Sequence, residues 1–280
     1  MTVNYVNYSE LVADTQLLAQ KVGWRPAAVL GIARSGMLPA ALLATHFHVP
    51  LGEARSFAST GRFFEAGRRL QWWAAGGPVL VVDDTTYAGT TMRSAVALLR
   101  AAPYPQWKYQ CATVYSHPDH VQTETLSVRE IARPRYFAWN FMQHPDAQQW
   151  MMDIDGILCA DPTAYDDDGP EYVQSLQTAV PLQLPQHQVH TIISCRLERW
   201  RPQTETWLWQ QGVRWQNLIL CPCATADERR RTIDYGAWKG EYYANSPCEL
   251  LVESSERQAQ SAFTVSQKPV LCPALGRILQ

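Results

Sequence analysis

The sequence predicts a two-domain α/β protein in which each domain is built on a parallel β-sheet. The chain has 280 residues, and a domain typically takes about 100–200 residues, so two domains are expected. Short apolar strands alternate with helical patterns in the first half, and a new set of strands begins after residue 146. Because strands that alternate with helices form parallel sheets with crossover connections, we expect one domain over residues 1–146 and a second over residues 147–280.

Hydrophobic spacing defines the elements of the first half. Leucine and valine side chains recur on one face of residues 8–22, which predicts an amphipathic helix. A β-branched run entered through Gly-Gly-Pro predicts a strand over 78–82, and a run of good helix formers predicts a helix over 90–100. The remaining elements expected here are a strand at 27–32, a helix at 37–47 and a strand at 109–115.

The same alternation restarts in the second half. Apolar runs predict strands, and the segment 204–211 between two of them is predicted to be helical. The expected strands lie at 149–154, 189–194, 218–220 and 249–253.

Composition argues against several classes of protein. The formal net charge is −2, with 24 basic and 26 acidic residues, so the overall charge does not favour a nucleic-acid partner. No segment approaches the roughly 20 apolar residues of a membrane-spanning helix. The first eight residues also lack the basic and apolar regions of a secretion signal. We therefore expect a cytoplasmic protein without a membrane segment.

The first candidate site follows the predicted strand 78–82. Asp83 and Asp84 end this strand, and a loop of small residues leads through Gly89 into the next helix. Ligands of open α/β sheets bind at the carboxyl ends of strands, and a helix N-terminus accepts phosphate. The hydroxyls of Thr90 and Thr91 add donors, whereas the two carboxylates suit ribose hydroxyls or a Mg²⁺ carried by a phosphorylated ligand.

This stretch resembles the signature of type I phosphoribosyltransferases, which bind phosphoribosyl pyrophosphate (PRPP). Ala88 departs from the pattern, because serine or threonine is usual there. A second stretch, Gly31-Ile-Ala-Arg-Ser-Gly-Met37, resembles the family's pyrophosphate loop, and the planar guanidinium of Arg34 suits that ligand. The residues that the resemblance implies for PRPP binding are Arg34, Ser35, Gly36, Asp83, Asp84, Thr85, Thr86, Tyr87, Ala88, Gly89, Thr90 and Thr91.

Two further segments of this half remain open to alternative interpretations. Residues 57–73 lie where the family has a mobile flap, and the arginines in and before this segment either close over a polyanion or form a solvated surface loop. These arginines are Arg55, Arg62, Arg68 and Arg69. Residues 136–141, with Trp139, lie where purine-type members carry an aromatic hood; they either stack on a nucleobase or pack against the domain core.

A second candidate site opens the second half. Asp153 and Asp155 stand at the end of the predicted strand 149–154, and the strand breaks at Gly156. An aspartate can attack phosphorus and form an aspartyl-phosphate, while a second carboxylate transfers a proton. Mg²⁺ between such carboxylates and a phosphate offsets their repulsion.

The Asp-x-Asp-Gly pattern resembles the first motif of the haloacid dehalogenase class of phosphatases. Ser194, Lys239 and Glu253 follow in the order of the class's other three motifs, although Ser254 stands where many members have a second acid. The residues implied for catalysis are Asp153, Asp155, Ser194 and Lys239, and those implied for Mg²⁺ are Asp153, Asp155 and Glu253. The two resemblances together imply Rossmann-like α/β/α sandwiches, the first phosphoribosyltransferase-like and the second haloacid dehalogenase-like with a small cap.

Three functions are consistent with this pattern. The first is a bifunctional enzyme that joins a nucleobase to PRPP, or runs the reverse reaction, and then hydrolyses a nucleotide phosphate. The second is a PRPP- or nucleotide-binding regulator, which would fit the departures at Ala88 and Ser254. The third is a nucleotidase whose first domain only recruits substrate. All three imply small-molecule ligands, and the resemblance to phosphoribosyltransferases suggests a homodimer.

Overall fold

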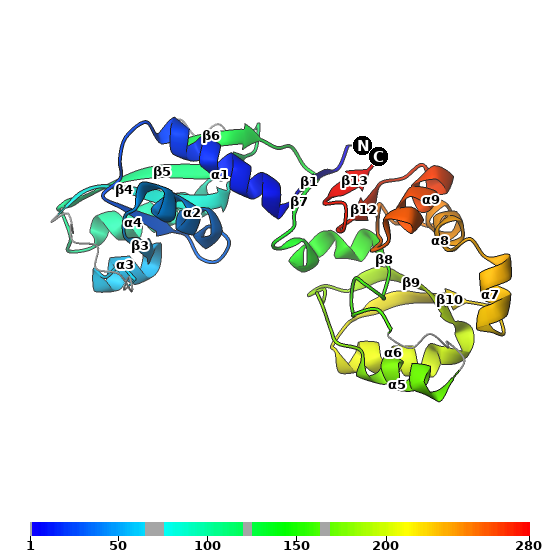
Figure 1. Cartoon of the computed structure of the whole chain (residues 1–280). Coiled ribbons are helices and arrows are strands. Elements are labelled where there is room, and N and C mark those ends of the chain that lie inside the picture. Colours follow the sequence, from blue (N-terminus) through cyan, green and yellow to red (C-terminus); the bar gives the residue numbers. More distant parts are fainter. Residues whose placement is uncertain (1, 65–75, 120–124, 163–168) are drawn as a thin grey trace. The chain divides into compact units, whose positions relative to one another are not determined.

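The computed structural model of the chain describes residues 2–64, 76–119, 125–162 and 169–280. Its contacts divide the chain into two compact units (Figure 1). The N-terminal unit is Val6–Arg135, and the C-terminal unit combines Met1–Tyr5 with Tyr136–Gln280. In the residues that the structure describes, no helix is both long and apolar enough to cross a membrane.

The boundary between the units differs from the expected one at residues 146 and 147. Tyr136 and Phe141 are buried in the same apolar cluster as Trp150, so the segment before residue 146 belongs to the C-terminal unit. The first residues join that unit as well, because the side-chain amide of Gln280 accepts from the backbone N–H of Val3 and donates to its carbonyl. Side-chain packing and terminal hydrogen bonds therefore decide where the units divide.

The N-terminal unit contains a five-stranded parallel sheet in the order β3-β2-β4-β5-β6. Counted along the chain, this order is 2-1-3-4-5, so the direction of winding reverses between β2 and β4. The strands are β2 (Ala28–Gly31), β3 (Leu51–Glu53), β4 (Gly77–Thr85), β5 (Trp107–Ser116) and β6 (Thr125–Glu130).

Helices cover this sheet. α3 and α4 pack on the side chains of Leu30 and Val81, while α1 and α2 contact each other and the strands. α1 begins with a capping box, in which the Asn7 side chain accepts from the backbone N–H of Glu10 and the Glu10 carboxylate accepts from that of Asn7. The helices are α1 (Tyr8–Val22), α2 (Met37–Phe47), α3 (Ala54–Thr60) and α4 (Thr90–Ala101).

The C-terminal unit contains a six-stranded sheet in the order β10-β9-β8-β11-β12-β13, in which only β13 is antiparallel to its neighbour. Its winding reverses between β8 and β11. The strands are β8 (Trp150–Met152), β9 (Val189–Leu197), β10 (Trp215–Cys221), β11 (Leu250–Val252), β12 (Val270–Cys272) and β13 (Arg277–Leu279). β1 (Asn4–Val6) and β7 (Arg135–Phe137) form a separate two-stranded sheet.

Both faces of this second sheet are covered. Trp207 and Leu208 of α6 pack on one face, and Tyr243 of α8 and Ala262 of α9 pack on the other. The helices are α5 (Pro170–Thr178), α6 (Arg201–Gln210), α7 (Ala226–Thr232), α8 (Tyr235–Ala244) and α9 (Glu256–Ser266). Short 3-10 turns span Phe141–Gln143, Pro145–Gln149 and Glu198–Trp200.

The structure confirms the expected α/β class and the parallel sheets. α1 and α2 have the predicted bounds, whereas β4 runs from Gly77 to Thr85 and so extends beyond the predicted range 78–82. The reason is a long parallel pairing with β5, which continues to Thr85 opposite Tyr115.

Candidate functional site

The two predicted phosphate-binding segments of the N-terminal unit meet at the point where its winding reverses. The turn at residues 33–36 follows β2, and Asp83 and Asp84 end the neighbouring strand β4. A Cβ added at Gly36 would lie 2.8 Å from Asp83 Oδ1, so the two segments are in direct contact. Open α/β sheets bind ligands at this kind of reversal, beside the carboxyl ends of the strands.

Two helices begin at this edge. The N-cap residue of α2 is Gly36 and that of α4 is Gly89, which has a φ of 68°. Among the described residues, no side chain caps either helix. In α2 the N–H groups of Met37 and Leu38 already donate to the carbonyls of Arg34 and Ser35, so the N-terminus of α4 is the one that can accept a ligand. Arg93 donates from Nη1 to the Ala88 carbonyl and holds the loop against α4. This arrangement suits an anion.

The acidic pair is deeply buried. Asp84 is 2% exposed, and its backbone N–H donates to Asp83 Oδ1 at 3.0 Å. Burial, and then the charge of Asp84, raises the pKa of Asp83 to about 8. Two carboxylates this close are stabilised by a bound cation or by hydroxyl donors, which is the chemistry expected of a ribose or a metal-bound phosphate.

The structure places every residue predicted to bind PRPP at this edge. Arg34, Ser35 and Gly36 form the turn before α2; Asp83, Asp84 and Thr85 end β4; Thr86, Tyr87, Ala88 and Gly89 form the loop; and Thr90 and Thr91 begin α4. Sequence reasoning missed the support of this loop: Arg135 donates to the Thr86 carbonyl, and the guanidinium of Arg133 lies 4.2 Å from the centre of the Tyr87 ring. Both arginines come from a distant stretch, so no local pattern indicates them.

The segments 57–73 and 136–141 were each open to two interpretations, and the structure bears mainly on the second of them. Of the flap arginines, Arg68 and Arg69 lie outside the described residues. The expected hood segment belongs to the C-terminal unit, where Tyr136 and Phe141 are buried in the core. The hydroxyl of Tyr136 donates to Asp146. These contacts favour the packing interpretation of that segment over a nucleobase contact.

The C-terminal unit has a cavity of about 550 Å³ beside its own reversal point. Asp153 and Asp155 follow β8, Ser194 lies near the end of β9, and Ser254 follows β11. The residues that line this cavity are Asp153, Asp155, Gly156, Asp161, Pro162, Tyr172, Ser194, Cys195, Arg196, Arg229, Tyr235, Lys239, Ser254, Ser255 and Gln258. Four of the five residues predicted for this site therefore share one cavity.

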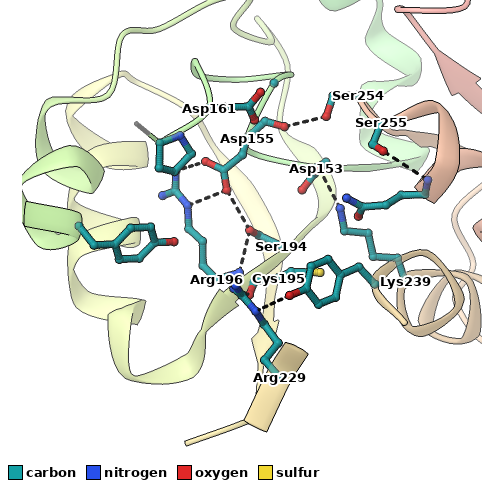
Figure 2. Close-up of a pocket in the computed structure, with 15 residues that line it drawn as sticks. Asp153, Asp155, Asp161, Ser194, Cys195, Arg196, Arg229, Lys239, Ser254 and Ser255 are labelled. Atoms are coloured by element: carbon teal, nitrogen blue, oxygen red, sulfur yellow. Dashed lines mark hydrogen bonds and ion pairs between the residues drawn. The ribbon is translucent and has the colours of Figure 1, made fainter. Parts of the chain in front are cut away.

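Lys239 connects two buried carboxylates. Its Nζ lies 2.8 Å from Asp153 Oδ2, a contact drawn in Figure 2, and 2.6 Å from Glu253 Oε2. Burial opposes the charge of Lys239, but the two carboxylates outweigh it and raise its pKa above the ordinary value. Burial and Glu253 in turn raise the pKa of Asp153 well above its usual range, although Lys239 opposes that shift. With both acids ionised, the three groups carry one net negative charge.

Asp155 points toward Arg196 instead of Lys239 (Figure 2). Its carboxylate accepts from Arg196 Nε at 3.0 Å and from Nη2 at 2.5 Å. Ser194 Oγ lies 3.5 Å from Asp155 Oδ2, and the backbone N–H of Arg196 donates to the same hydroxyl. The site therefore offers one carboxylate beside an ammonium group and another beside a guanidinium.

The predicted metal set needs a correction. In the described part of the chain, no three histidine, cysteine or acidic residues are grouped so that they could hold a metal ion. Glu253 is fully buried and binds Lys239, so its carboxylate acts on the site through that lysine. Hard oxygen donors nevertheless remain in the Asp153 carboxylate and the Asp155 carbonyl, which accepts from Ser254 Oγ at 3.0 Å. This chemistry fits Mg²⁺ with water and phosphate oxygens completing its shell.

Most of the other residues that line this cavity were not predicted from the sequence. Arg229 donates to the Cys195 carbonyl at 2.6 Å and to the Tyr235 hydroxyl at 3.1 Å. Asp161 lies beside Gly156, because a Cβ added there would be 3.5 Å from Asp161 Oδ1. Only Arg196 had a usable signal: in an extended strand, residues i and i+2 point to the same side, so Arg196 accompanies Ser194.

Comparison with known proteins supports the interpretation of the first unit. Residues 15–125 match the family model "Phosphoribosyl transferase domain". None of the curated proteins matches the chain.

Among solved structures, one similar protein is the xanthine-guanine-hypoxanthine phosphoribosyltransferase of Helicobacter pylori, which is 15% identical with a TM-score of 0.37. The match covers 49% of this chain and 93% of the Helicobacter pylori chain. The purine phosphoribosyltransferase of Pyrococcus horikoshii is 18% identical, covering 50% and 94%, with a TM-score of 0.38. The orotate phosphoribosyltransferase of Aeropyrum pernix is 24% identical, covering 44% and 70%, with a TM-score of 0.31. The matched residues 15–125 include both segments of the N-terminal unit that were predicted to bind phosphate.

Proposed function

We propose that the N-terminal unit binds PRPP and transfers its phosphoribosyl group to a nucleobase, or runs the reverse reaction. The observation that carries this proposal is the contact between the turn at 33–36 and Asp83, at the reversal point of a sheet whose residues match the transferase family. In the forward direction, the bond between ribose C1 and pyrophosphate breaks while C1 bonds to a nitrogen of the base, and that nitrogen loses its proton to water or to the departing pyrophosphate.

Each part of this edge has a proposed role. Asp83 and Asp84 accept hydrogen bonds from the ribose hydroxyls, or they coordinate a metal ion that PRPP carries. The N-terminus of α4, with Thr90 and Thr91, binds the 5′-phosphate. Arg34 binds the pyrophosphate, for which a planar guanidinium is well suited.

Calorimetric titration with PRPP and Mg²⁺, followed by pyrophosphate release with a panel of nucleobases, tests this proposal. Asp84→Asn should weaken binding at least about tenfold, because a charge-assisted hydrogen bond contributes about 1.5–3 kcal/mol. Asp119→Asn is the matched control, since that side chain is 78% exposed. Binding without turnover of any base would favour a regulator, and no binding would refute the proposal.

We further propose that the C-terminal unit hydrolyses phosphate monoesters. The observation that favours this second activity is Asp153 in a cavity shared with Ser194 and Lys239, at the reversal point of the sheet. The Asp153 carboxylate attacks phosphorus and the bond to the leaving oxygen breaks, while Asp155 gives that oxygen a proton. Water then attacks the aspartyl-phosphate, Asp155 takes its proton, and phosphate is released.

The surrounding groups support this chemistry electrostatically. Lys239 holds the Asp153 carboxylate in place and offsets its charge, while the Ser194 hydroxyl is available to a phosphoryl oxygen. Mg²⁺, bound through the Asp153 carboxylate and the Asp155 carbonyl, would offset the phosphate charge and polarise the phosphoryl group.

Phosphate release from purine and pyrimidine 5′-monophosphates with Mg²⁺ tests the second activity and its coupling to the first. Asp153→Asn should abolish release, whereas Asp227→Asn should not, because that side chain is 79% exposed and pairs with Arg230. A preference for the base used by the transferase would support a coupled enzyme that forms a nucleotide and then removes its phosphate. No release from any nucleotide would refute the coupling.

A further inference from the structure

Arg196 is a buried arginine whose guanidinium binds a carboxylate of the candidate site in the C-terminal unit. Its side chain is 1% exposed, and its guanidinium makes two hydrogen bonds to the Asp155 carboxylate, from Nε to Oδ2 and from Nη2 to Oδ1 (Figure 2). Such a two-point contact fixes the orientation of a carboxylate as well as its distance. Asp155 remains 21% exposed, so the carboxylate that Arg196 holds also faces the cavity.

The rest of the guanidinium is anchored in the protein. Nη2 donates to Cys159 Sγ at 3.3 Å, and Nη1 lies 3.5 Å from Thr204 Oγ1 at the start of α6. Burial opposes the charge, but Asp155 outweighs it and raises the pKa of Arg196 above its ordinary value. Moving Asp155 away would leave a buried charge without its carboxylate, which typically costs several kcal/mol.

The other contacts of Asp155 are long by comparison. Ser194 Oγ and Cys159 Sγ each lie 3.5 Å from its carboxylate oxygens. Ser254 Oγ bonds the backbone carbonyl of Asp155 and leaves the side chain unaffected. Arg196 therefore decides where the Asp155 carboxylate lies.

We propose that Arg196 is a positioning residue that holds the Asp155 carboxylate where it takes the proton of the attacking water. This inference rests on the proposed phosphomonoester hydrolysis. Arg196 itself transfers no proton and forms no bond to phosphorus. Its role is to remove the other rotamers of Asp155, because proton transfer needs a heavy-atom separation of about 2.6–3.2 Å.

Kinetics with p-nitrophenyl phosphate test the proposal. Arg196→Lys keeps the charge but loses the two-point contact, so kcat should fall about 100-fold with little change in KM, in line with the usual contribution of a positioned acid or base. In an Asp155→Asn background the same substitution should cost almost nothing further, because there is no carboxylate left to position. Guanidinium chloride at low concentration should restore part of the kcat of Arg196→Ala.

Matched controls separate positioning from folding. Arg214→Lys should keep wild-type kcat, because Arg214 is an exposed arginine of the same unit whose side chain donates to the Gln186 carbonyl. Equal losses from Arg196→Lys with and without Asp155→Asn would overturn the proposal, since a purely structural role would be additive. No phosphate release by the wild type would instead refute the proposed hydrolysis.

A crystal structure of ligand-free Arg196→Lys supplies a readout that does not depend on activity. The Asp155 carboxylate should leave its present position or occupy more than one rotamer. A single unchanged rotamer without the arginine would overturn the proposal whether or not the enzyme turns over.

Discussion

Lys239 lies between two buried carboxylates, and its replacement by methionine tests the architecture of the C-terminal site. Its contacts to Asp153 and Glu253 are 2.8 and 2.6 Å long. At an effective dielectric constant of about 20, each contact contributes about 6 kcal/mol of attraction, which offsets several kcal/mol of desolvation for each ion. Removing one partner of a buried pair typically costs about 3–5 kcal/mol, so Lys239→Met should lower the free energy of unfolding by that amount at neutral pH.

This loss should depend on pH in a defined direction. Burial and the charge of Glu253 raise the pKa of Asp153 above its unfolded value. The folded state then binds an extra proton between the two pKa values, so this group's contribution to stability falls as pH rises through that window. Without Lys239 nothing offsets the repulsion between the two carboxylates, so the pKa of Asp153 in the folded state should rise further. The deficit of Lys239→Met should therefore shrink as pH is lowered.

Urea-dependent hydrogen exchange, followed on peptides from β8 and β11, measures the stability of this unit directly. Lys268→Met is the matched control, because Lys268 is a half-buried lysine of the same unit whose Nζ bonds the carbonyls of Tyr243 and Ser246 and lies 4.3 Å from the centre of the Tyr243 ring. The double substitution Lys239→Met with Glu253→Gln should recover part of the loss. If Lys239→Met costs no more than the control, or its deficit is independent of pH, the assigned electrostatic role is wrong.

Two further predictions concern backbone and charge. Gly156→Ala should cost about 2–4 kcal/mol, because Gly156 has a φ of 77° and a Cβ would lie 2.6 Å from Ser254 Cβ. Gly212→Ala should cost only about 1 kcal/mol, since φ is 71° but nothing lies within 4 Å of its added Cβ; urea unfolding of the two variants compares them. The pKa of Asp83, raised to about 8 by burial and by Asp84, means that the N-terminal unit loses stability as pH rises from about 4 through 8, by at most about 1.4 kcal/mol per pH unit. Asp83→Asn should flatten this dependence in hydrogen exchange of the unit, and an unchanged slope would contradict the raised pKa.

Local pattern was sufficient for the elements with strong signals. α1 and α2 have their predicted bounds, and in α1 the ends of the apolar pattern coincide with the Asn7 capping box and with Gly23. The short strands β3 and β12 and helices such as α9 were not predicted. Strands of three residues carry too little pattern to be distinguished from loops, and they form because neighbouring strands complete their hydrogen bonds.

Among the candidate site residues, too, those that lie close together in the sequence were predicted and those that come from separate elements were not. The acidic pair of β4 and the spacing of Asp153 and Asp155 are visible in the sequence because each set lies within a few residues. Arg196 and the exact partners of Glu253 were not assigned from the sequence. Which charge meets which carboxylate depends on side chains that arrive from separate strands and helices.

Periodicity and short motifs are local properties, and they were enough to predict the α/β class, the parallel sheets and the candidate site segments at the strand ends. The unit boundary after Arg135, the pairing of Glu253 with Lys239 and the pairing of Asp155 with Arg196 could be seen only in the folded chain. These outcomes depend on burial, since a charge removed from water must find its partner wherever the folded chain provides one.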